Sequence, residues 1–322
     1  MVILAADIGG SQARLLLGEC EGEGARWREL RRETLPSREF AGIDALLQHF
    51  LRPGERPQAA CLALAGPVHG RRVRMTNLPW TVDATALAGR FGLRRLRLIN
   101  DFAAQACGLP LLGAADLRTL QAGSPLPGAA RALLGAGTGL GMALLAETPA
   151  GEPVALPSEG GHADFAPRDP QQLALLEHLL PRHGRVSLEL LLCGHGLERL
   201  YRFVAGLPAS APRSVDAAAV TAAALAGDAQ AAAAVDLFAR LLASAAGNLA
   251  LTGLARGGVY LSGGIAPRIL PFLQQASVIE AFVDKPPMRE LLEQVPLHVV
   301  SNDQLGLLGA AQTAALLARE RA

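Results

Sequence analysis

The sequence predicts an α/β protein of two domains, and three observations indicate this fold class. Short apolar runs of strand length alternate with helix-forming stretches along most of the 322 residues, as in an open α/β sheet. The stretch 98–108 reads LINDFAAQACG, so an apolar strand ends at two polar side chains and continues as a small-residue helix. A pattern of strand, glycine turn and strand occurs twice. The length itself suggests about two domains.

The first glycine turn follows a predicted buried strand at residues 2–6 and precedes a second apolar run at 13–17. Its members are a strand-ending acid, two glycines and a hydroxyl: Asp7, Gly9, Gly10 and Ser11. A Rossmann or Walker loop would lead into a helix instead, and the single lysine, Lys285, leaves no GxxxxGK motif. A glycine turn with a hydroxyl can present N–H groups to phosphate. An ordinary tight hairpin is the alternative.

The next elements lead to a polar strand end. The pattern predicts helices at 43–51 and 83–91 and strands at 59–65, 71–75 and 95–99. The last strand delivers Asn100 and Asp101 to the carboxyl edge of the sheet, where ligands of open α/β sheets bind. A carboxylate there can accept a proton from a substrate hydroxyl. It can equally be a helix N-cap, since Asp and Asn favour that position.

A domain boundary is predicted at 109–113, where Pro and Gly interrupt the chain, and residues 114–130 are expected to be rich in loops. The opening pattern then recurs, with apolar runs at 132–134 and 142–145 on either side of a glycine loop. That loop contains Gly137, Thr138 and Gly139. The recurrence indicates two related halves, each offering one loop to the same polyanion.

The segment SEGGHADF, residues 158–165, places two glycines between Glu159 and His162. Glycines let the backbone bend so that the two polar side chains converge. Hydroxyl recognition needs such acceptors and donors, whereas a metalloprotease-type zinc site would show HExxH on a helix. A polar surface turn is the alternative.

The remaining sequence predicts helices and one more glycine turn. Helices are expected at 170–182, 186–204, 215–251, 266–275 and 305–319, a loop at 206–214, and a strand at 297–300. The alanine-rich stretch 215–251 has high helix propensity. A strand near 258–262 leads into the third glycine turn, with Gly263 and Gly264.

The composition bears on three properties: nucleic-acid binding, cellular compartment and membrane association. The net charge is +1 with acids and bases interspersed, so no electrostatic footprint for nucleic acid is expected. The four cysteines, at 20, 61, 107 and 193, form no CxxC. Reduced thiols in a cytoplasmic protein are therefore expected. No basic leader precedes the first apolar run, and no run reaches ~18 uninterrupted apolar residues, so no membrane association is expected.

Taken together, the motifs DIGGSQARL, LINDFAAQACGLP, GAGTGLGMAL, EGGHADFAP, AGNLALTGLARGGVYLSGGI and GLLGAA resemble the bacterial glucokinase family. This family belongs to the superfamily of sugar kinases, heat-shock ATPases and actin, and the resemblance runs from about residue 5 to about residue 314. It implies a two-domain actin-like ATPase fold, related to ribonuclease H, with the active site in the interdomain cleft. It also implies domains at 1–110, completed by a C-terminal helix at 302–322, and at 111–301.

The resemblance implies phosphorylation of glucose at O6 by ATP and Mg²⁺, and a homodimer. Asp101 would be the catalytic base. The residues that would bind the sugar are Asn100, Asp101, Glu159, His162 and Glu189. Those that would line the phosphates or face the adenosine are Asp7, Gly9, Gly10, Ser11, Gly137, Thr138, Gly139, Gly263 and Gly264. Asp7 would act near the metal through water. The role of Glu189 comes from the resemblance alone.

The chain departs from the family's usual residues at three places: Ser11-Gln12 for Thr-Asn, Cys193 for Ser, and Pro286-Pro287 for Gly-Arg. The alternative within enzymes is a kinase for another hexose or an amino sugar. A sugar-sensing regulator would need a DNA-binding head, for which the first strand at residue 2 leaves no room. An actin-like filament protein would keep the nucleotide loops but would have no reason for the pairs Asn100–Asp101 and Glu159–His162.

Overall fold

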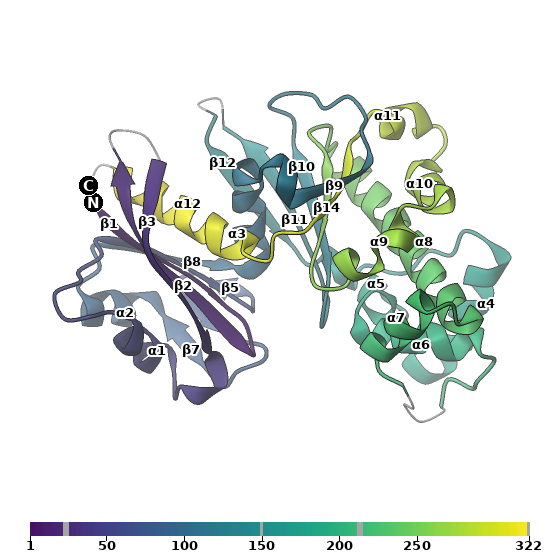
Figure 1. Cartoon of the computed structure of the whole chain (residues 1–322), viewed down its shortest axis with the longest axis horizontal. Helices are drawn as coiled ribbons and strands as arrows, with labels where there is room; N and C mark the ends of the chain where they lie inside the picture. The colour runs from purple at the N-terminus through teal and green to yellow at the C-terminus, as the bar shows by residue number, and fades with distance from the viewer. Residues whose placement is uncertain (22–25, 149–150, 211–214, 321–322) are drawn as a thin grey trace. The chain divides into compact units, whose positions relative to one another are not determined.

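The structure is a computed structural model that describes residues 1–21, 26–148, 151–210 and 215–320. The chain folds as two compact units (Figure 1). Unit 1 comprises Met1–Gly113 and Gln304–Ala322, and unit 2 comprises Ala114–Asp303. Each unit is built on its own sheet and has its own hydrophobic core.

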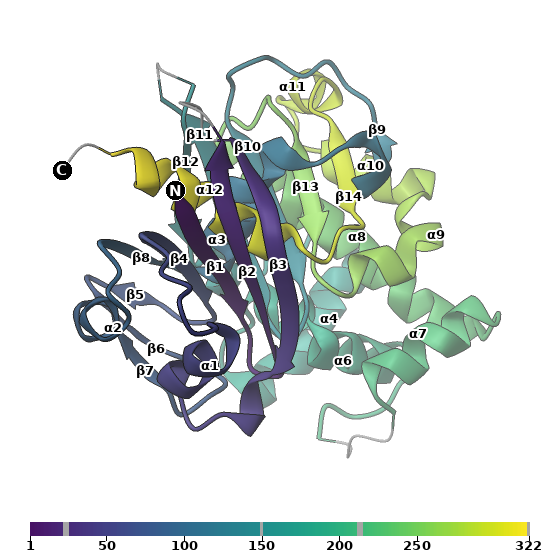
Figure 2. The ribbon, with the colours of Figure 1, turned by 60° about the vertical axis from the view of Figure 1, so that its left-hand side comes forward.

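Unit 1 contains a five-stranded sheet in the order β3-β2-β1-β4-β8 and a small sheet in the order β5-β6-β7 (Figure 2). The strands are β1 Val2–Ile8, β2 Gln12–Glu21, β3 Arg26–Pro36, β4 Ala59–Leu64, β5 Val68–His69, β6 Arg72–Arg74, β7 Thr81–Asp83 and β8 Arg95–Asn100. The helices are α1 Ile43–Phe50, α2 Ala84–Phe91, α3 Asp101–Gly108 and α12 Leu305–Arg319.

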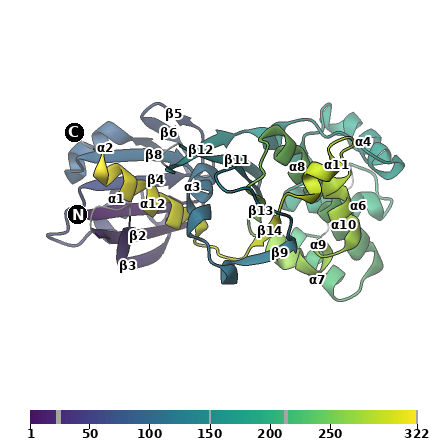
Figure 3. The ribbon, with the colours of Figure 1, turned by 90° about the horizontal axis from the view of Figure 1, so that it is seen from above.

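Helices cover both faces of the larger sheet in unit 1. Alternate residues of β1, such as Leu4 and Ala6, pack in one core with α1 and α2, whereas Ile3 and Ala5 pack in another with α12. Figure 3 shows α12 running along the sheet beside α3. Because β1 is buried on both faces, its sequence is a continuous apolar run rather than an alternating one.

The parallel order of β1, β4 and β8 brings their carboxyl ends to one edge of the sheet. Asp7 pairs with Ala63, and Leu64 pairs with Asn100. The predicted hairpin at the first glycine turn is confirmed, since β1 and β2 pair antiparallel from Ile8 and Ala13 onward.

Unit 2 contains a six-stranded sheet in the order β12-β11-β10-β13-β14-β9. Its strands are β9 Leu117–Gln121, β10 Arg131–Ala136, β11 Leu140–Glu147, β12 Pro153–Ser158, β13 Val259–Ser262 and β14 Leu297–Val300. Its helices are α4 Pro170–His183, α5 Leu188–Leu191, α6 Gly194–Val204, α7 Ala217–Leu225, α8 Ala229–Thr252, α9 Leu270–Leu273, α10 Ala276–Val283 and α11 Arg289–Glu293. One core joins the sheet to these helices.

Helix α8 is the centre of that core. By length and composition it could cross a membrane, but 72% of its most apolar window is buried inside the protein. A buried core helix of a globular domain meets the same two criteria, so this helix is weak evidence for a membrane span.

Several predicted elements were wrong in extent. The stretch expected to be loop-rich, 114–130, contains β9, which pairs with β14. The helix expected at 186–204 is two helices, α5 and α6. The helix expected at 215–251 is also two, because Gly227 adopts a φ of +95° and Asp228 caps α8 through its side chain. The helix expected at 266–275 is a 3₁₀ turn, Ala266–Ile269, followed by α9. Part of the loop expected at 206–214 lies outside the described residues.

Candidate active site

The carboxyl edge of the sheet in unit 1 gathers the acidic residues predicted from the first glycine turn and from LINDF. Burial raises the pKa of Asp7 to about 6, opposed by the Arg14 guanidinium and reinforced by the negative charge of Asp101. The nearest Arg14 nitrogen lies 3.7 Å from Asp7 Oδ2. Asp7 and Asp101 therefore lie close enough to interact electrostatically, although they are far apart in sequence.

Asn100 and Asp101 stand where β8 passes into α3. The side-chain oxygen of Asn100 caps the helix by accepting the N–H groups of Phe102, at 2.9 Å, and Ala103, at 3.3 Å. Asp101 is the first residue of α3, and its Oδ1 accepts the N–H of Phe102 at 3.0 Å. The capping role thus falls on Asn100, so the Asp101 carboxylate is not needed as the cap.

The first glycine turn is braced by residues that the sequence did not point to. The Ser37 hydroxyl donates to the Gly9 carbonyl at 2.9 Å, and Arg38 Nε donates to the Gly10 carbonyl at 3.2 Å. These bonds occupy carbonyl groups of the turn. The Gly9 N–H itself donates to the Gln12 carbonyl at 2.9 Å, so the groups expected to face an anion here are the N–H groups of Gly10 and Ser11.

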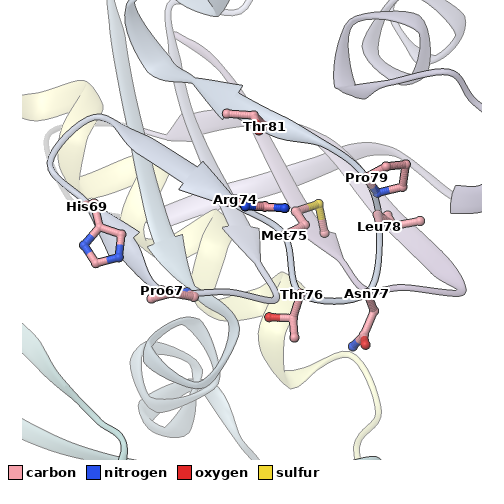
Figure 4. Close-up of a pocket in the computed structure, with 9 residues that line it drawn as sticks. All are labelled: Pro67, His69, Arg74, Met75, Thr76, Asn77, Leu78, Pro79 and Thr81. Atoms are coloured by element: carbon pink, nitrogen blue, oxygen red, sulfur yellow. The ribbon is translucent and has the colours of Figure 1, made fainter.

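Asn77 is a third neighbour of this turn that sequence reasoning missed. A Cβ atom on Gly10 would lie 2.6 Å from Asn77 Cβ, so only glycine allows this close approach. Asn77 lines a pocket of unit 1 between Pro67 and Thr81, and Figure 4 shows Thr76 and Asn77 projecting together from its loop. The available signal was the polar pair within MTNLPW, which resembles an ordinary turn.

In unit 2 the residues of the EGGH segment converge with Glu189. The turn is a 3₁₀ helix, Gly160–His162. His162 Nε2 lies 4.0 Å from Glu159 Oε2, and His162 Nδ1 lies 3.8 Å from Glu189 Oε1. All three side chains keep solvent access, at 74% for Glu159, 58% for His162 and 35% for Glu189. This cluster of two acceptors and an imidazole can hydrogen-bond several hydroxyl groups of one ligand.

The second and third glycine turns lie side by side in unit 2. They follow β10 and β13, which pair in parallel with Gly135 opposite Ser262. The N–H of Ile265 reaches the Ala136 carbonyl at 3.3 Å. The structure therefore brings the loop Gly137–Gly139 next to Gly263 and Gly264.

One of the three departures has a structural explanation. Cys193 replaces the family's usual serine as the N-cap of α6, with its Sγ accepting the Gly196 N–H at 3.3 Å. Lys285, before Pro286-Pro287, is buried and donates from Nζ to Ser244 Oγ at 2.6 Å. Gln12 begins β2 opposite Pro36. Nothing in the structure explains Gln12 or Pro286-Pro287.

No cluster of three or more His, Cys, Asp or Glu side chains with metal-site geometry occurs among the described residues. The neighbouring carboxylates Asp7 and Asp101 are nevertheless suited to Mg²⁺, which prefers oxygen ligands and keeps several waters when it binds with a nucleotide phosphate. This donor set fits an ion held mainly by substrate and water.

Comparison with known proteins agrees with this geometry. The family model described as glucokinase matches residues 4–317. A glucokinase from Chromohalobacter salexigens is 41% identical, with 96% of each chain covered. The crystal structure of a glucokinase from an Antarctic psychrotroph is 34% identical, covers 99% of each chain and has a TM-score of 0.88.

A hexokinase of the ROK family from Thermus thermophilus shares the fold alone, at 23% identity and a TM-score of 0.68, with 99% of this chain and 100% of that chain covered. These neighbours have the actin-like ATPase fold, which confirms the predicted fold class. The predicted resemblance is likewise confirmed by matches over nearly the whole length, and the chain belongs to the glucokinase family.

Proposed function

We propose that this chain transfers the γ-phosphoryl group of ATP to O6 of D-glucose, giving glucose 6-phosphate and ADP, the first step of glucose use in glycolysis. Membership of the glucokinase family supports this reaction. The observation that carries the assignment of residues is the strand end at Asn100 and Asp101, where Asn100 caps α3 and the Asp101 carboxylate lies near enough to Asp7 to raise its pKa.

Asp101 is the general base of the proposed reaction. Phosphoryl transfer depends mainly on positioning the nucleophile in line and on stabilising charge. The Asp101 carboxylate orients the O6 hydroxyl and accepts its proton as the bond to phosphorus forms. Its backbone is fixed by the junction of β8 and α3, so the carboxylate is held without needing the substrate to order it.

The sugar ring is held by Asn100 of unit 1 and by Glu159, His162 and Glu189 of unit 2. Carboxylates accept hydrogen bonds from sugar hydroxyls, and the imidazole can donate or accept. These are the two polar clusters that the sequence carries in addition to the nucleotide loops.

The phosphates are bound by backbone N–H groups of the two glycine turns, at 9–11 and 137–139, and the adenosine lies near Gly263 and Gly264. Asp7 acts near Mg²⁺ through water. When bound, the ion neutralises part of the charge on the transferring phosphoryl group. Because the chain has no Walker lysine, the backbone groups carry much of the remaining stabilisation.

The protein is proposed to be cytoplasmic and homodimeric. None of the four cysteines, all of which lie in the described residues, forms a disulfide, and three of them are buried. Proteins of reducing compartments usually keep their thiols in this form, which supports the proposed compartment. Sedimentation equilibrium over a concentration series tests the dimer.

An ADP-release assay over glucose, mannose, fructose, galactose and N-acetylglucosamine tests the proposed reaction. Glucose is expected to give the highest kcat/KM, and the product is expected to be a substrate for glucose-6-phosphate dehydrogenase. A higher kcat/KM for another hexose or for the amino sugar would support the alternative substrate. ADP release that does not depend on any sugar would contradict the proposal.

A further inference from the structure

The Glu189 carboxylate faces two different parts of the candidate site within unit 2. Its Oε2 accepts the backbone N–H of Leu140 at 3.0 Å, directly after the glycine loop 137–139. Its Oε1 lies 3.8 Å from His162 Nδ1, on the side of the EGGH turn. One side chain thus contacts both the loop proposed to bind phosphate and the cluster proposed to bind sugar.

The glycine loop is shaped around this carboxylate. A Cβ atom on Gly139 would lie 2.6 Å from Glu189 Oε2 and 3.4 Å from its Cδ. Glycine at this position therefore provides the space that the carboxylate occupies. The hydrogen bond to Leu140 also fixes the point at which the loop passes into β11.

The backbone on either side of Glu189 is hydrogen-bonded to the EGGH turn and to the glycine loop. The N–H of Leu188 donates to the Ala163 carbonyl at 2.9 Å, and Ser187 forms a β-bridge with Asp164, just after the EGGH turn. At the other end, the N–H of Gly194 donates to the Gly137 carbonyl at 2.9 Å. The segment 187–194 is therefore bonded to the sugar turn at its start and to the glycine loop at its end.

We propose that Glu189 is a positioning residue for the glycine loop 137–139 and that it thereby couples the binding of sugar to the binding of nucleotide. A sugar hydroxyl bonded to Oε1 restricts the carboxylate, and a restricted carboxylate holds the Leu140 N–H and the loop in place. The coupling rests on the proposed function. The positioning of the loop does not require a sugar and can be measured alone.

The coupling is reciprocal by thermodynamic necessity. If glucose raises the affinity for nucleotide by some factor, nucleotide raises the affinity for glucose by the same factor. Removing the Glu189 side chain should therefore weaken nucleotide binding without sugar and bring the coupling factor close to one. Replacing it with glutamine should preserve the loop, because the amide oxygen can still accept the Leu140 N–H.

Calorimetric titration with a non-hydrolysable ATP analogue and Mg²⁺, without sugar, tests the positioning. Glu189→Ala is expected to weaken binding on the order of tenfold, the loss typical of a hydrogen bond to a charged acceptor. Glu189→Gln is expected to stay within about threefold of the wild type. Glu159→Gln is the matched control, since Glu159 belongs to the same sugar cluster and its carboxylate lies beside His162 rather than against the loop. Its analogue affinity should not change.

A second arm uses Gly139→Ala in the wild-type and Glu189→Ala backgrounds. If the added methyl group is harmful because it meets the Glu189 carboxylate, the loss of analogue affinity should be much smaller when that carboxylate is absent. Non-additivity between contacting positions is the expected signature. If Glu189→Ala alone folds poorly, the single variants Glu189→Gln and Gly139→Ala still test the contact, because both retain the long side chain. Gly139→Ala should then weaken analogue binding, and Glu189→Gln should not.

The third arm repeats the titrations with saturating glucose. The wild type is expected to bind the analogue more tightly with glucose than without it, and Glu189→Ala is expected to lose this difference. Wild-type analogue affinity and an unchanged glucose effect in Glu189→Ala would overturn the inference. Analogue binding without any glucose binding by the wild type would instead overturn the proposed function, and the sugar-free titrations would still judge the loop contact.

Discussion

The Asp7 carboxylate occupies the space that a side chain on Gly306 would need. A Cβ atom at position 306 would lie 2.7 Å from Asp7 Oδ2 and 2.9 Å from its Cγ. Gly306 lies in the first turn of α12, so the C-terminal helix covers the end of β1 from the opposite end of the sequence. This contact contributes to the burial that raises the pKa of Asp7.

Gly306→Ala is therefore expected to displace Asp7 and to impair the use of ATP with Mg²⁺. Misplacement of a catalytic-site group by about 1 Å can cost on the order of 10²-fold in rate. Steady-state kinetics with varied ATP at fixed Mg²⁺ measures the effect. Gly89→Ala is the matched control, because a Cβ atom there meets nothing within 4 Å in the exposed face of α2. It should keep full activity and gain about 0.5–1 kcal/mol of stability. Unchanged kinetics in Gly306→Ala would show that the contact has no functional role.

Lys285 gives a pH-dependent prediction. Burial lowers its pKa to about 8 from its usual 10.5; nearby Arg168 acts in the same direction and Asp284 opposes. Between these values the unfolded chain binds a proton that the folded chain does not, so the free energy of unfolding falls as pH falls. The change of the Lys285 pKa from 10.5 to about 8 corresponds to about 3 kcal/mol of unfolding free energy. The folded protein has this stability above pH 10.5 and has lost it by about pH 8.

Denaturant unfolding of Lys285→Met and wild type at pH 7 to 11 checks this. The variant should gain about 3 kcal/mol relative to the wild type as pH falls through this range. Ser244→Ala, which removes the partner of the lysine and keeps the lysine itself, should retain the wild-type slope. Parallel curves for Lys285→Met and wild type would mean that folding does not lower the pKa of Lys285.

Glu159→Gln and His162→Ala are expected to weaken the use of glucose much more than the binding of nucleotide. A buried hydrogen bond to a charged group contributes roughly 1.5–3 kcal/mol; because both side chains are more than half exposed, we expect the lower end of that range once the sugar excludes water. Kinetics with varied glucose, and analogue titration without sugar, separate the two effects. If KM and kcat for glucose stay at wild-type values in both variants, the EGGH segment is a polar surface turn.

Glucose alone is expected to slow hydrogen exchange in both units. If one sugar is held by Asn100 and by the EGGH cluster, the amides at 100–103 and at 160–163 should gain protection together. A ligand shifts a conformational equilibrium only through its differential affinity for the two states. Protection confined to one unit would mean that the two clusters do not share a ligand.

The sequence predicted the elements whose local pattern is strong. The apolar strands of unit 1, the helix after Asn100 and both glycine hairpins have signals within a few residues. Strands β3 and β12 were missed because they are largely exposed and carry charged or mixed side chains, which give no apolar alternation. The break between α7 and α8 did have a local signal, since Gly227 followed by Asp228 suits a helix end and a new N-cap. This signal was missed because the high alanine content on both sides of it predicts one continuous helix.

Site residues were predictable where the residues that would carry the chemistry stand together in one short motif. Asp101, Glu159 and His162 stand out within LINDF and EGGH. Glu189 has no such motif, and its contacts with Leu140 and His162 depend on the folding of segments 27 to 49 residues apart. The contacts of Gly10 with Asn77 and of Gly306 with Asp7 join residues that are still farther apart in the sequence. Only the family resemblance indicated Glu189, and nothing in the sequence indicated the two glycine contacts.

The central claim is that Asp101 removes the proton from the sugar hydroxyl, and Asp101→Asn tests it most directly. The substitution keeps the size of the side chain and removes its basicity. Single-turnover transfer of phosphate from ATP to glucose should slow on the order of 10²–10⁴-fold, whereas glucose binding and the unfolding transition should stay close to those of the wild type. Near-normal phosphoryl transfer by a folded Asp101→Asn protein would contradict the account.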